Sequence, residues 1–333
     1  MQKAWDEREI IRLSGAYWAA CTLHTAVLLD IFTWLDEGVS NEEELASRIQ
    51  CDVRAFSMLI TSLASMGFLE RDGKILKSSP AILELLSKKS PKYMGFIIKH
   101  HAHIMPAWTK LAQAVQRGQA VFEERSSTKE DLAEREAFLM GMFNVARLQA
   151  ENVAKAMDFS RCKHLLDLGG GPGTYAIYFC LKNPNLSATV FDLPTTESFA
   201  GKTIERFGLS GRIGFMAGNF LEDALPSDQD AAWLSQILHG ETPEDASKLV
   251  AKAAGCLNPG GLLCIQEFML DDDRNGPEHA ALFSLNMLVQ TPGGQAYTRG
   301  ELEEMMLRAG LREISMVDVK LPGSCRIMVG ERP

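Results

Sequence analysis

A glycine-rich run from Asp167 to Gly173 contains the residues of this 333-residue chain whose types and spacing point most directly to chemistry. It follows a short apolar segment typical of a buried strand, and a helical pattern begins directly after it at Thr174. Glycines allow a tight turn and a close approach of the backbone to a ligand, and the helix start offers free N–H groups. Asp192 ends the next apolar segment, at the distance along the chain where an acid accepts hydrogen bonds from ribose hydroxyls. The loop and the acid together predict a binding site for a nucleoside-containing cofactor.

The spacing of the glycines distinguishes between cofactors. A dinucleotide fingerprint needs a third glycine where this chain has Thr174, counting from Gly169. The carboxylate of Asp167 stands ahead of the glycines, and it suits a ligand with a cationic amino-acid part better than a pyrophosphate, which it would repel. S-adenosylmethionine carries an ammonium group, a sulfonium and an adenosine. The run therefore resembles that of the class I S-adenosylmethionine-dependent methyltransferases, with a tight turn that binds no ligand as the simpler alternative.

A histidine stands where a substrate is expected. His239 follows the apolar segment 234–238, which we expect to be the end of a strand, and Thr242 and Pro243 then have the pattern of a helix N-terminus. In open α/β sheets, ligands bind beyond the carboxyl ends of the strands. A free imidazole has a pKa of about 6.5 and a phenol one of about 10, so a neutral imidazole can assist the phenol's deprotonation. We predict that His239 is a general base; a polar residue that merely closes a strand is the alternative.

Three segments, 192–194, 234–241 and 258–261, are similar to the small-molecule O-methyltransferase family, which includes plant caffeate and hydroxyindole enzymes and bacterial polyketide tailoring enzymes. The resemblance covers nearly the whole chain. It implies that S-adenosylmethionine is the methyl donor, that His239 is the catalytic histidine, and that Glu267 is an acid that flanks it. It also implies an N-terminal winged-helix domain that forms a dimer, and it requires no metal ion.

The chain departs from this family at several positions near the histidine. In the family the catalytic histidine is usually followed by Asp and Trp, where this chain has Gly240 and Glu241. Plant members have a second flanking acid where this chain has Ala296, and often have asparagine where it has Thr291. His239 is therefore expected to have at most one flanking carboxylate from these positions.

The motifs and the resemblance also assign a cofactor site. Its expected residues are Asp167, Gly169, Gly171, Asp192, Leu193, Gly218, Asn219, Phe220, Ser235 and Gln236. Asn219 replaces the acid of the family's Gly-Asp-Phe, and its carbonyl can still accept a hydrogen bond from the adenine amine. Phe220 offers a face for the purine, with ordinary core packing as the alternative.

Apolar and aromatic residues are expected to bind the substrate between the cofactor domain and the helices before it. The candidates are Met140, Phe143 and Asn144, which match a family helix motif, together with Met105, Trp108, Phe283, Met287 and Tyr297. Each of them taken alone is also typical of a core. The neighbouring His100, His101 and His103 lack the partner spacing of a metal site, so we expect a solvated or pocket-facing helix turn there.

Helical periodicity dominates the N-terminal part of the chain. An apolar pattern predicts one helix over Ile10–Leu35, and Asn41 with Glu44 has the capping signature of a further helix. A helix near 53–66 and a hairpin around Asp72-Gly73 complete the helix, helix, hairpin order of a winged helix.

Strands and helices alternate from residue 163 onward. The expected strands are 164–168, 188–192, 212–216, 230–238 and 260–268, with a turn at 258–261 and two more strands between Leu311 and Gly330. The pattern predicts an α/β fold with a Rossmann-like methyltransferase sheet that is doubly wound, mostly parallel and seven-stranded. The expected domains are a winged-helix dimerisation domain (1–95), a helical linker that contributes to the substrate pocket (96–158) and an S-adenosylmethionine-binding domain (159–333).

A winged helix raises the alternative of DNA binding, which the charges disfavour. Arg54 is the only basic residue in 53–66, whereas readout of a DNA groove needs several. The net charge of −9 also disfavours a nucleic-acid partner. We expect instead a homodimer through the N-terminal domain, with Trp18, Leu28, Leu29 and Trp34 exposed to the second copy.

Composition bounds the remaining possibilities. Seven scattered cysteines without a C-x-x-C pair are typical of reduced thiols. The polar start of the chain and the lack of a long apolar run predict a cytoplasmic protein that spans no membrane. We therefore predict an enzyme that transfers a methyl group from S-adenosylmethionine to a hydroxyl of a small aromatic molecule. Nitrogen or carbon methylation, a cofactor-binding relative that does not methylate, and a nicotinamide-dependent oxidoreductase are the alternatives.

Overall fold

The computed structural model describes residues 5–121 and 129–333 of the chain. Its contacts divide the chain into two compact units, residues 1–103 with 129–144 and residues 104–128 with 145–333. Helices α7 (Gly95–Trp108) and α9 (Lys129–Ala156) each continue from one unit into the other. The expected domain boundaries after residues 95 and 158 stay predictions.

The first unit is mainly helical. Its elements before α7 are α1 (Glu7–Ser14), α2 (Tyr17–Leu28), α3 (Ile31–Asp36), α4 (Glu42–Ile49), α5 (Val53–Ser65), β1 (Glu70–Asp72), β2 (Ile75–Lys77) and α6 (Pro80–Leu86). The two strands pair antiparallel as a hairpin. The Asn41 side chain accepts hydrogen bonds from the N–H groups of Glu43 and Glu44 at the start of α4. The predicted cap and the predicted helix, helix, hairpin order are both present.

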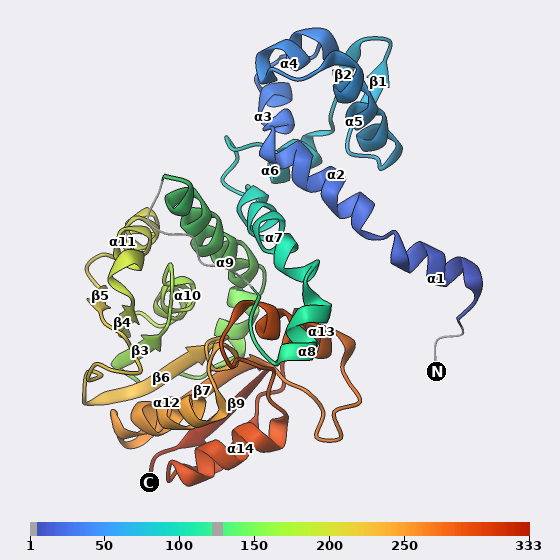
Figure 1. Cartoon of the computed structure of the whole chain (residues 1–333). Coiled ribbons are helices and arrows are strands. Elements are labelled where there is room, and N and C mark those ends of the chain that lie inside the picture. Colours follow the sequence, from blue (N-terminus) through green and yellow to red (C-terminus); the bar gives the residue numbers. More distant parts are fainter. Residues whose placement is uncertain (1–4, 122–128) are drawn as a thin grey trace. The chain divides into compact units, whose positions relative to one another are not determined.

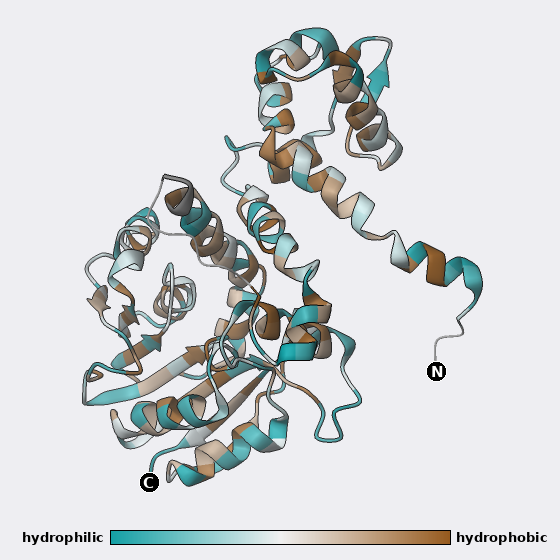
Figure 2. Ribbon diagram, viewed as in Figure 1, coloured by the Kyte–Doolittle hydropathy of each residue, from teal (hydrophilic) through white to brown (hydrophobic). Residues whose placement is uncertain are grey.

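The single helix predicted over Ile10–Leu35 is wrong, because this segment forms α1, α2 and α3 (Figure 1). Asp30 has a φ of +56°, a left-handed conformation that ends α2 and turns the chain into α3. As a result Leu29 and Trp34 are half-buried against the unit's own core, whereas Trp18 and Leu28 are exposed. Figure 2 shows that apolar residues also lie on α1.

The second unit is built on a seven-stranded sheet with the order β5-β4-β3-β6-β7-β9-β8. Its strands are β3 (His164–Leu168), β4 (Ser187–Asp192), β5 (Ile213–Ala217), β6 (Gln229–Ser235), β7 (Leu257–Phe268), β8 (Arg312–Met316) and β9 (Cys325–Glu331). The strands from β3 to β7 pair parallel, and β9 pairs antiparallel with both β7 and β8. The predicted α/β fold with a mostly parallel, seven-stranded sheet is confirmed.

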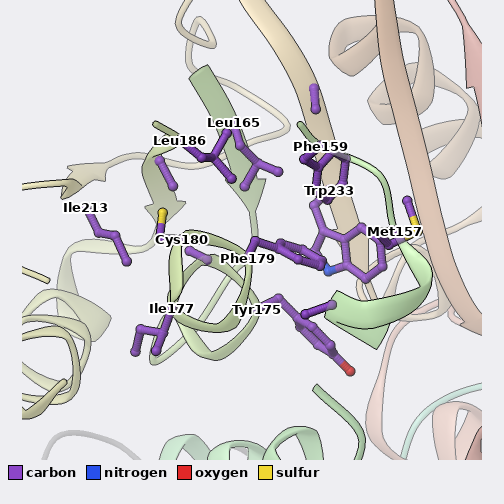
Figure 3. Close-up of a cluster of buried hydrophobic side chains, with 14 of the residues drawn as sticks. Met157, Phe159, Leu165, Tyr175, Ile177, Phe179, Cys180, Leu186, Ile213 and Trp233 are labelled. Carbon is purple, nitrogen blue, oxygen red and sulfur yellow. The ribbon is translucent and has the colours of Figure 1, made fainter. Parts of the chain in front are cut away.

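Helices cover both faces of this sheet (Figure 1). Besides the parts of α7 and α9 that belong to it, this unit has the helices α8 (Leu111–Arg117), α10 (Thr174–Lys182), α11 (Glu197–Arg206), α12 (Pro243–Gly255), α13 (Glu278–Gln290) and α14 (Arg299–Arg308), and the 3-10 turns η1 (Pro194–Thr196), η2 (Leu238–Gly240) and η3 (Pro322–Ser324). Leu165 packs in a core with α9, α10 and α11, whereas its neighbour Leu166 packs in a core with α12 and α14. In the first core the Trp233 and Phe179 ring centroids lie 4.8 Å apart (Figure 3). This alternation along β3 is what a sheet covered on both faces requires.

Two predicted boundaries within the sheet are wrong. The strand expected over 230–238 ends at Ser235, because Gln236 has a φ of +55° and the chain then enters η2. The turn expected at 258–261 lies inside β7, with Gly260 in the left-handed region at +77°. The first difference decides where His239 lies. Within residues 5–121 and 129–333, no helix has the length and apolar character that a membrane crossing requires.

Candidate active site

The predicted glycine loop connects β3 to α10 in the second unit. Gly169, Gly171 and Gly173 have φ values of +64°, +54° and +77°, a region that side chains other than glycine rarely adopt. A Cβ atom added at Gly169 would lie 2.6 Å from Ile237 Cγ2. At Gly171 an added Cβ would meet no atom of the described residues within 4 Å, so this part of the loop borders open space. The backbone therefore leaves room on one side of the loop for a ligand.

Asp167 lies beneath this loop. A Cβ atom at Gly170 would lie 2.6 Å from Asp167 Cγ, so the middle glycine is required by the carboxyl under it. Asp167 Oδ2 accepts a hydrogen bond from the Ala176 N–H (3.1 Å), whereas Oδ1 has no hydrogen-bond partner among the described residues. Burial raises the pKa of Asp167 to about 7, and the negative charge of Asp192 adds to the rise, while the Ala176 N–H opposes it. A cationic ligand beside the loop would favour the charged form of this carboxyl, so these residues fit the predicted sulfonium cofactor.

Asp192, at the end of β4, is fixed by three donors. Its Oδ2 accepts a hydrogen bond from the Gly171 N–H (2.8 Å), and its Oδ1 accepts from the Leu193 N–H (2.7 Å) and from Thr196 Oγ1 (3.1 Å). The loop and the acid that the sequence assigned to one site are thus joined directly. Leu193 is exposed beside them.

The residues predicted after the third strand of the parallel set lie beside Asp192. The Gly218 N–H donates to the Asp192 carbonyl oxygen (2.9 Å), and a Cβ at Gly218 would lie 2.4 Å from Phe191 Cζ. Asn219 Oδ1 accepts a hydrogen bond from the Leu221 N–H (3.0 Å), which leaves it one lone pair for a further donor. Phe220 is half-buried against the core that contains α12, so part of its ring has the ordinary packing role that was the alternative to contact with the purine.

The carboxyl end of β6 lies next to the end of β3, since Leu168 pairs with Leu234. Ser235 is the last residue of β6, and the N–H of Gln236 donates to the Gln266 carbonyl oxygen (2.8 Å). The left-handed Gln236 ends the ladder and directs the chain into η2, which contains His239.

His239 and Glu267 form a close pair. His239 Nδ1 lies 2.7 Å from Glu267 Oε2, and the His239 backbone N–H donates to Glu267 Oε1 (3.3 Å). The side chain of Glu267 is 2% exposed and that of His239 is 13% exposed. Since the carboxylate engages Nδ1, the ring presents Nε2 as its basic nitrogen. The Phe283 ring meets the imidazole at an angle of 78°, with ring centroids 4.7 Å apart.

The structure shows the surroundings of three residues at which the chain departs from the family pattern, Thr291, Ala296 and Glu241. The Thr291 hydroxyl accepts a hydrogen bond from the Gly294 N–H (2.9 Å), and a Cβ at Gly294 would lie 2.3 Å from the His239 carbonyl oxygen. Ala296 is buried in a small apolar cluster, where a plant-type acid would be costly. Burial raises the pKa of the Glu241 carboxyl, as does the charge of nearby Asp245, while His239 opposes the rise.

The substrate candidates are divided between the two units. In the second unit, Trp108 Nε1 donates to Asn286 Oδ1 (2.8 Å), Met287 is buried, and the Tyr297 hydroxyl donates to the Glu241 carbonyl oxygen (2.8 Å). Met105 also belongs to this unit, in the last part of α7.

The candidates of the first unit lie on α9. Met140 is half-buried, whereas Phe143 and Asn144 are buried. Asn144 Nδ2 donates to the Tyr93 carbonyl oxygen (2.8 Å), so the residue has a local structural role. Contact of these residues with a substrate stays a prediction.

The three neighbouring histidines lie on the part of α7 that belongs to the first unit. His100 packs against Phe138, with ring centroids 5.2 Å apart, and burial lowers its pKa to about 4. His103 Nδ1 lies 2.9 Å from Glu134 Oε1. In the described part of the chain, no group of three or more His, Cys, Asp or Glu side chains is arranged to bind a metal ion.

Sequence reasoning missed a buried polar cluster next to the glycine loop. The Tyr175 hydroxyl accepts hydrogen bonds from Gln149 Nε2 (2.9 Å) and Gln266 Nε2 (2.7 Å), and all three residues are buried. Their positions in α9, α10 and β7 are far apart in the sequence, and each residue type is unremarkable in its own element. The local sequence gives no signal that would have joined them.

Comparisons with known proteins agree with this arrangement. The sequence profile described as an O-methyltransferase domain matches residues 108–312. The chain is 33% identical over 322 residues to 3-hydroxy-5-methyl-1-naphthoate 3-O-methyltransferase of Streptomyces sahachiroi. This match covers 96% of the chain and 93% of that protein. It is 31% identical over 275 residues to the N,N-dimethyltransferase OxyT of Streptomyces rimosus, with 79% of each chain covered.

A solved structure extends the comparison to the cofactor. Human N-acetylserotonin methyltransferase in complex with S-adenosylmethionine matches with a TM-score of 0.86 and 26% identity, over 100% of this chain and 99% of that one. The predicted resemblance, enzyme class and methyl donor are thereby confirmed at the level of the family. The chain belongs to the S-adenosylmethionine-dependent O-methyltransferase family.

Proposed function

We propose that this enzyme methylates a hydroxyl group of a small aromatic molecule, with His239 as the general base. The observation that carries the proposal is the 2.7 Å contact between His239 Nδ1 and the buried Glu267 carboxylate, at the end of the sheet where the glycine loop lies. This pair supplies a fixed proton acceptor next to a cofactor site.

We assign the cofactor to the ends of β3, β4, β5 and β6. Gly171 borders open space on the side of the ligand, whereas Gly169 and Gly218 allow the close packing that gives the site its shape. Asp192 accepts hydrogen bonds from the ribose hydroxyls, and Asp167 adds negative charge beneath the loop. The remaining contacts are assigned to Leu193, Asn219, Phe220, Ser235 and Gln236. When bound, S-adenosylmethionine supplies an electrophilic methyl group on a sulfonium.

The proton of the substrate goes to His239 Nε2. A phenol has a pKa of about 10, so the phenol is mostly protonated at neutral pH. Removal of its proton while the bond between the oxygen and the methyl carbon forms makes the oxygen a better nucleophile. Glu267 stabilises the resulting imidazolium and keeps the ring oriented through Nδ1. With Ala296 in place of a second acid, the base depends on Glu267 alone among the predicted flanking positions.

The substrate class rests on apolar residues of the second unit and on relatives. Phe283 packs against His239, and Trp108, Met105 and Met287 are the other candidates of this unit for contact with a flat ring. The roles of Met140, Phe143 and Asn144 stay predictions from the sequence. The naphthoate specificity in the name of the Streptomyces sahachiroi relative supports an aromatic hydroxyl. Nitrogen methylation is the second candidate, because the OxyT relative is named an N,N-dimethyltransferase.

The test is a methyl-transfer screen with labelled donor over phenols, catechols, hydroxynaphthoates and matched aromatic amines. We expect the His239→Ala variant to lose about 10²–10⁴-fold in turnover, the range of one general base, while its affinity for S-adenosylhomocysteine is kept. His164→Ala is the matched control, because His164 lies at the opposite end of β3. Unchanged turnover in His239→Ala would show that His239 is not the general base. Methylated product from the amines alone would favour nitrogen methylation. Binding of NAD instead of S-adenosylhomocysteine would contradict the assigned cofactor site.

A homodimer through the first unit is a second proposal. Large apolar side chains are exposed on α1 (Ile10, Ile11 and Leu13) and on α2 (Trp18 and Leu28). Exposed apolar side chains gathered in one part of the chain suggest a surface that a partner covers. The Leu13→Asp/Trp18→Asp variant is expected to sediment as a monomer at concentrations where the wild type is a dimer. Leu307→Asp, at an exposed leucine of α14, is the control. A monomeric wild type would overturn the proposal.

We propose no nucleic-acid partner for the winged helix. A groove of about 820 Å³ on this unit is lined by the acids Glu42, Glu43 and Asp52 as well as by Arg54, Arg71 and Lys74. Arg71 is also ion-paired with Glu42, with Nε 2.7 Å from Oε2. This balance of charge gives no basic face for phosphates. Retention on DNA at physiological salt would contradict the proposal.

A further inference from the structure

Lys252, in the last turn of α12, binds the loop that follows β5. Its half-buried side chain donates hydrogen bonds from Nζ to the carbonyl oxygens of Phe220 (2.6 Å) and Asp223 (2.7 Å). An ammonium group has three N–H donors, so one lysine can bind two converging carbonyl oxygens at once. Hydrogen bonds from a charged donor are also stronger than those between neutral groups. These contacts tie the helix to the loop 218–223.

The same loop carries two residues of the assigned cofactor site, Asn219 and Phe220. It is closed by its own hydrogen bonds, because the Asn219 N–H donates to Asp223 Oδ2 (2.8 Å) and the Asp223 N–H donates to the Asn219 carbonyl oxygen (2.8 Å). Phe220 and Leu221 are half-buried against the core that contains α12. Lys252 therefore binds a compact turn whose side chains belong in part to the site.

A single peptide group connects Lys252 to the side chain of Asn219. The carbonyl group of Phe220 and the N–H of Leu221 belong to one planar peptide unit. Lys252 Nζ donates to the oxygen of this unit, and its N–H donates to Asn219 Oδ1 (3.0 Å). The orientation of this peptide plane, which the ammonium holds from one side, therefore sets the direction of the N–H on the other side.

This N–H decides which way the Asn219 amide faces. Because an N–H can donate to the amide oxygen but not to the amide nitrogen, Oδ1 lies toward Leu221 and the NH2 group lies away from it. In this orientation Oδ1 keeps one lone pair for the amine of an adenine. An amide rotated by half a turn would instead offer its NH2 group, which suits a carbonyl oxygen at the same position of a purine.

We propose that Lys252 is a positioning residue that, through the peptide between Phe220 and Leu221, keeps the Asn219 amide in the orientation that selects the exocyclic amine of adenine. The proposal rests on the cofactor site assigned above. Lys252 acts through the loop and makes no contact of its own with the ligand. It fixes the acceptor before the ligand binds, and preorganisation of this kind lowers the cost of ordering a group on binding.

The test compares two ligands by titration calorimetry, S-adenosylhomocysteine and S-inosylhomocysteine, which has a carbonyl oxygen in place of the amine. We expect the wild type to bind the adenosyl ligand about tenfold more tightly, the value of one hydrogen bond. In Lys252→Met the affinity for the adenosyl ligand should fall about fivefold to tenfold, while the affinity for the inosyl ligand changes by less than about twofold. The preference for adenine is then lost.

Three further variants serve as controls for this measurement. Lys252→Arg is expected to keep the preference, because a guanidinium can also donate to both carbonyl oxygens. Lys252→Gln, whose amide is one bond shorter, is a second variant that is expected to lose it. Lys248→Met removes an exposed lysine one turn earlier in α12, paired with Asp245 (Nζ to Oδ1, 2.8 Å), and is expected to bind both ligands as the wild type does.

The Asn219→Asp background separates orientation from general support of the loop. Both oxygens of a carboxylate are acceptors, so rotation of this side chain changes nothing. In Asn219→Asp the preference for adenine should therefore be kept, and the additional change Lys252→Met should not reduce it. A loss of the preference in this double variant would overturn the orienting role.

The remaining outcomes distinguish this proposal from the proposed function. A preference that is kept in Lys252→Met, or equal losses of affinity for both ligands, would overturn the role of Lys252 and leave the cofactor site in place. A wild type that binds both ligands equally well would do the same. A wild type that binds neither ligand would overturn the cofactor site as well.

Discussion

Asp192, at the end of β4, accepts hydrogen bonds from two backbone N–H groups and one hydroxyl. Glu267, near the end of β7, accepts from the side chain and backbone of His239 and from the N–H of the next residue, Phe268 (3.3 Å). We call the ends of β3 and β4 the cofactor edge and the ends of β6 and β7 the base edge. At the cofactor edge the donors come with the loop itself, so the geometry survives most side-chain changes nearby. At the base edge the geometry depends on two side chains together. We therefore expect the cofactor edge to be robust and the base edge to fail after a single substitution.

The largest expected effect is at the base edge. In Glu267→Gln the new amide carbonyl can still accept the Nδ1 proton, but the negative charge that stabilises the imidazolium is lost. We expect turnover to fall about 10²–10³-fold, within the range of general-base catalysis, with unchanged affinity for S-adenosylhomocysteine. Steady-state kinetics and calorimetry on the same sample measure both. Glu304→Gln, at an exposed position of α14, is the control. If Glu267→Gln lost both affinity and turnover, the two edges would not be separable.

A smaller effect is expected from the carboxylate of the cofactor edge. Asp192→Ala removes the acceptor for Gly171, Leu193 and Thr196, and with it the proposed contacts to the ribose. We expect affinity for S-adenosylhomocysteine to fall about 30-fold, which corresponds to about 2 kcal/mol for hydrogen bonds to a charged group. Asp228→Asn in an exposed loop is the control. Retained affinity would mean that the loop backbone alone forms the site.

Asp167 tests the cofactor edge through pH. Its pKa in the folded protein is raised to about 7, above the value of an unfolded aspartate, so the folded state keeps a proton that the unfolded state has lost. The stability that the protonated Asp167 side chain contributes is complete below about pH 4 and is lost as the pH rises through about 7. Relative to the Asp167→Asn variant, the free energy of unfolding of the wild type should thus fall by about 2 kcal/mol between pH 5.5 and pH 8. Urea unfolding followed by tryptophan fluorescence at both pH values measures this difference. A stability difference between the two proteins that does not depend on pH would contradict the raised pKa.

The smallest effect concerns Gln236, the left-handed residue directly after β6. Gln236 has a φ of +55°, and a left-handed conformation costs a residue with a side chain about 1 kcal/mol relative to glycine. We expect Gln236→Gly to be more stable than Gln236→Ala by about this amount in thermal unfolding. Equal stability of the two variants would indicate that the backbone changes conformation when the side chain is removed.

The two edges also differ in how well the sequence predicted them. The glycine spacing and Asp192 form a local pattern with a steric reason, so the loop, both bounds of the strand before it and the first residue of the helix after it were predicted. The end of β6 was predicted three residues too late, because Gln236-Ile237-Leu238 has the composition of a strand and a single left-handed residue leaves no signal in the residue types. The helix predicted over Ile10–Leu35 fails for the same reason at Asp30.

Residues that meet through the fold were the hardest to predict. The family resemblance suggested Glu267 as the partner of His239, and the structure brings the two side chains together. Nothing suggested the Tyr175 cluster, because its members come from three elements and look like ordinary helix and strand residues. The apolar site of Ala296 could be noted as a departure, but its burial depends on Leu270 and Ala280, which only the folded chain places beside it.

The unequal support of the catalytic pair has a consequence for the enzyme in warm solution. Glu267 belongs to a twelve-residue strand with neighbours on both sides, whereas His239 belongs to a three-residue turn followed by a loop. Short turns open at a lower free energy than central strands do. Catalysis should therefore fade on heating while the sheet is still intact, and cooling should restore it.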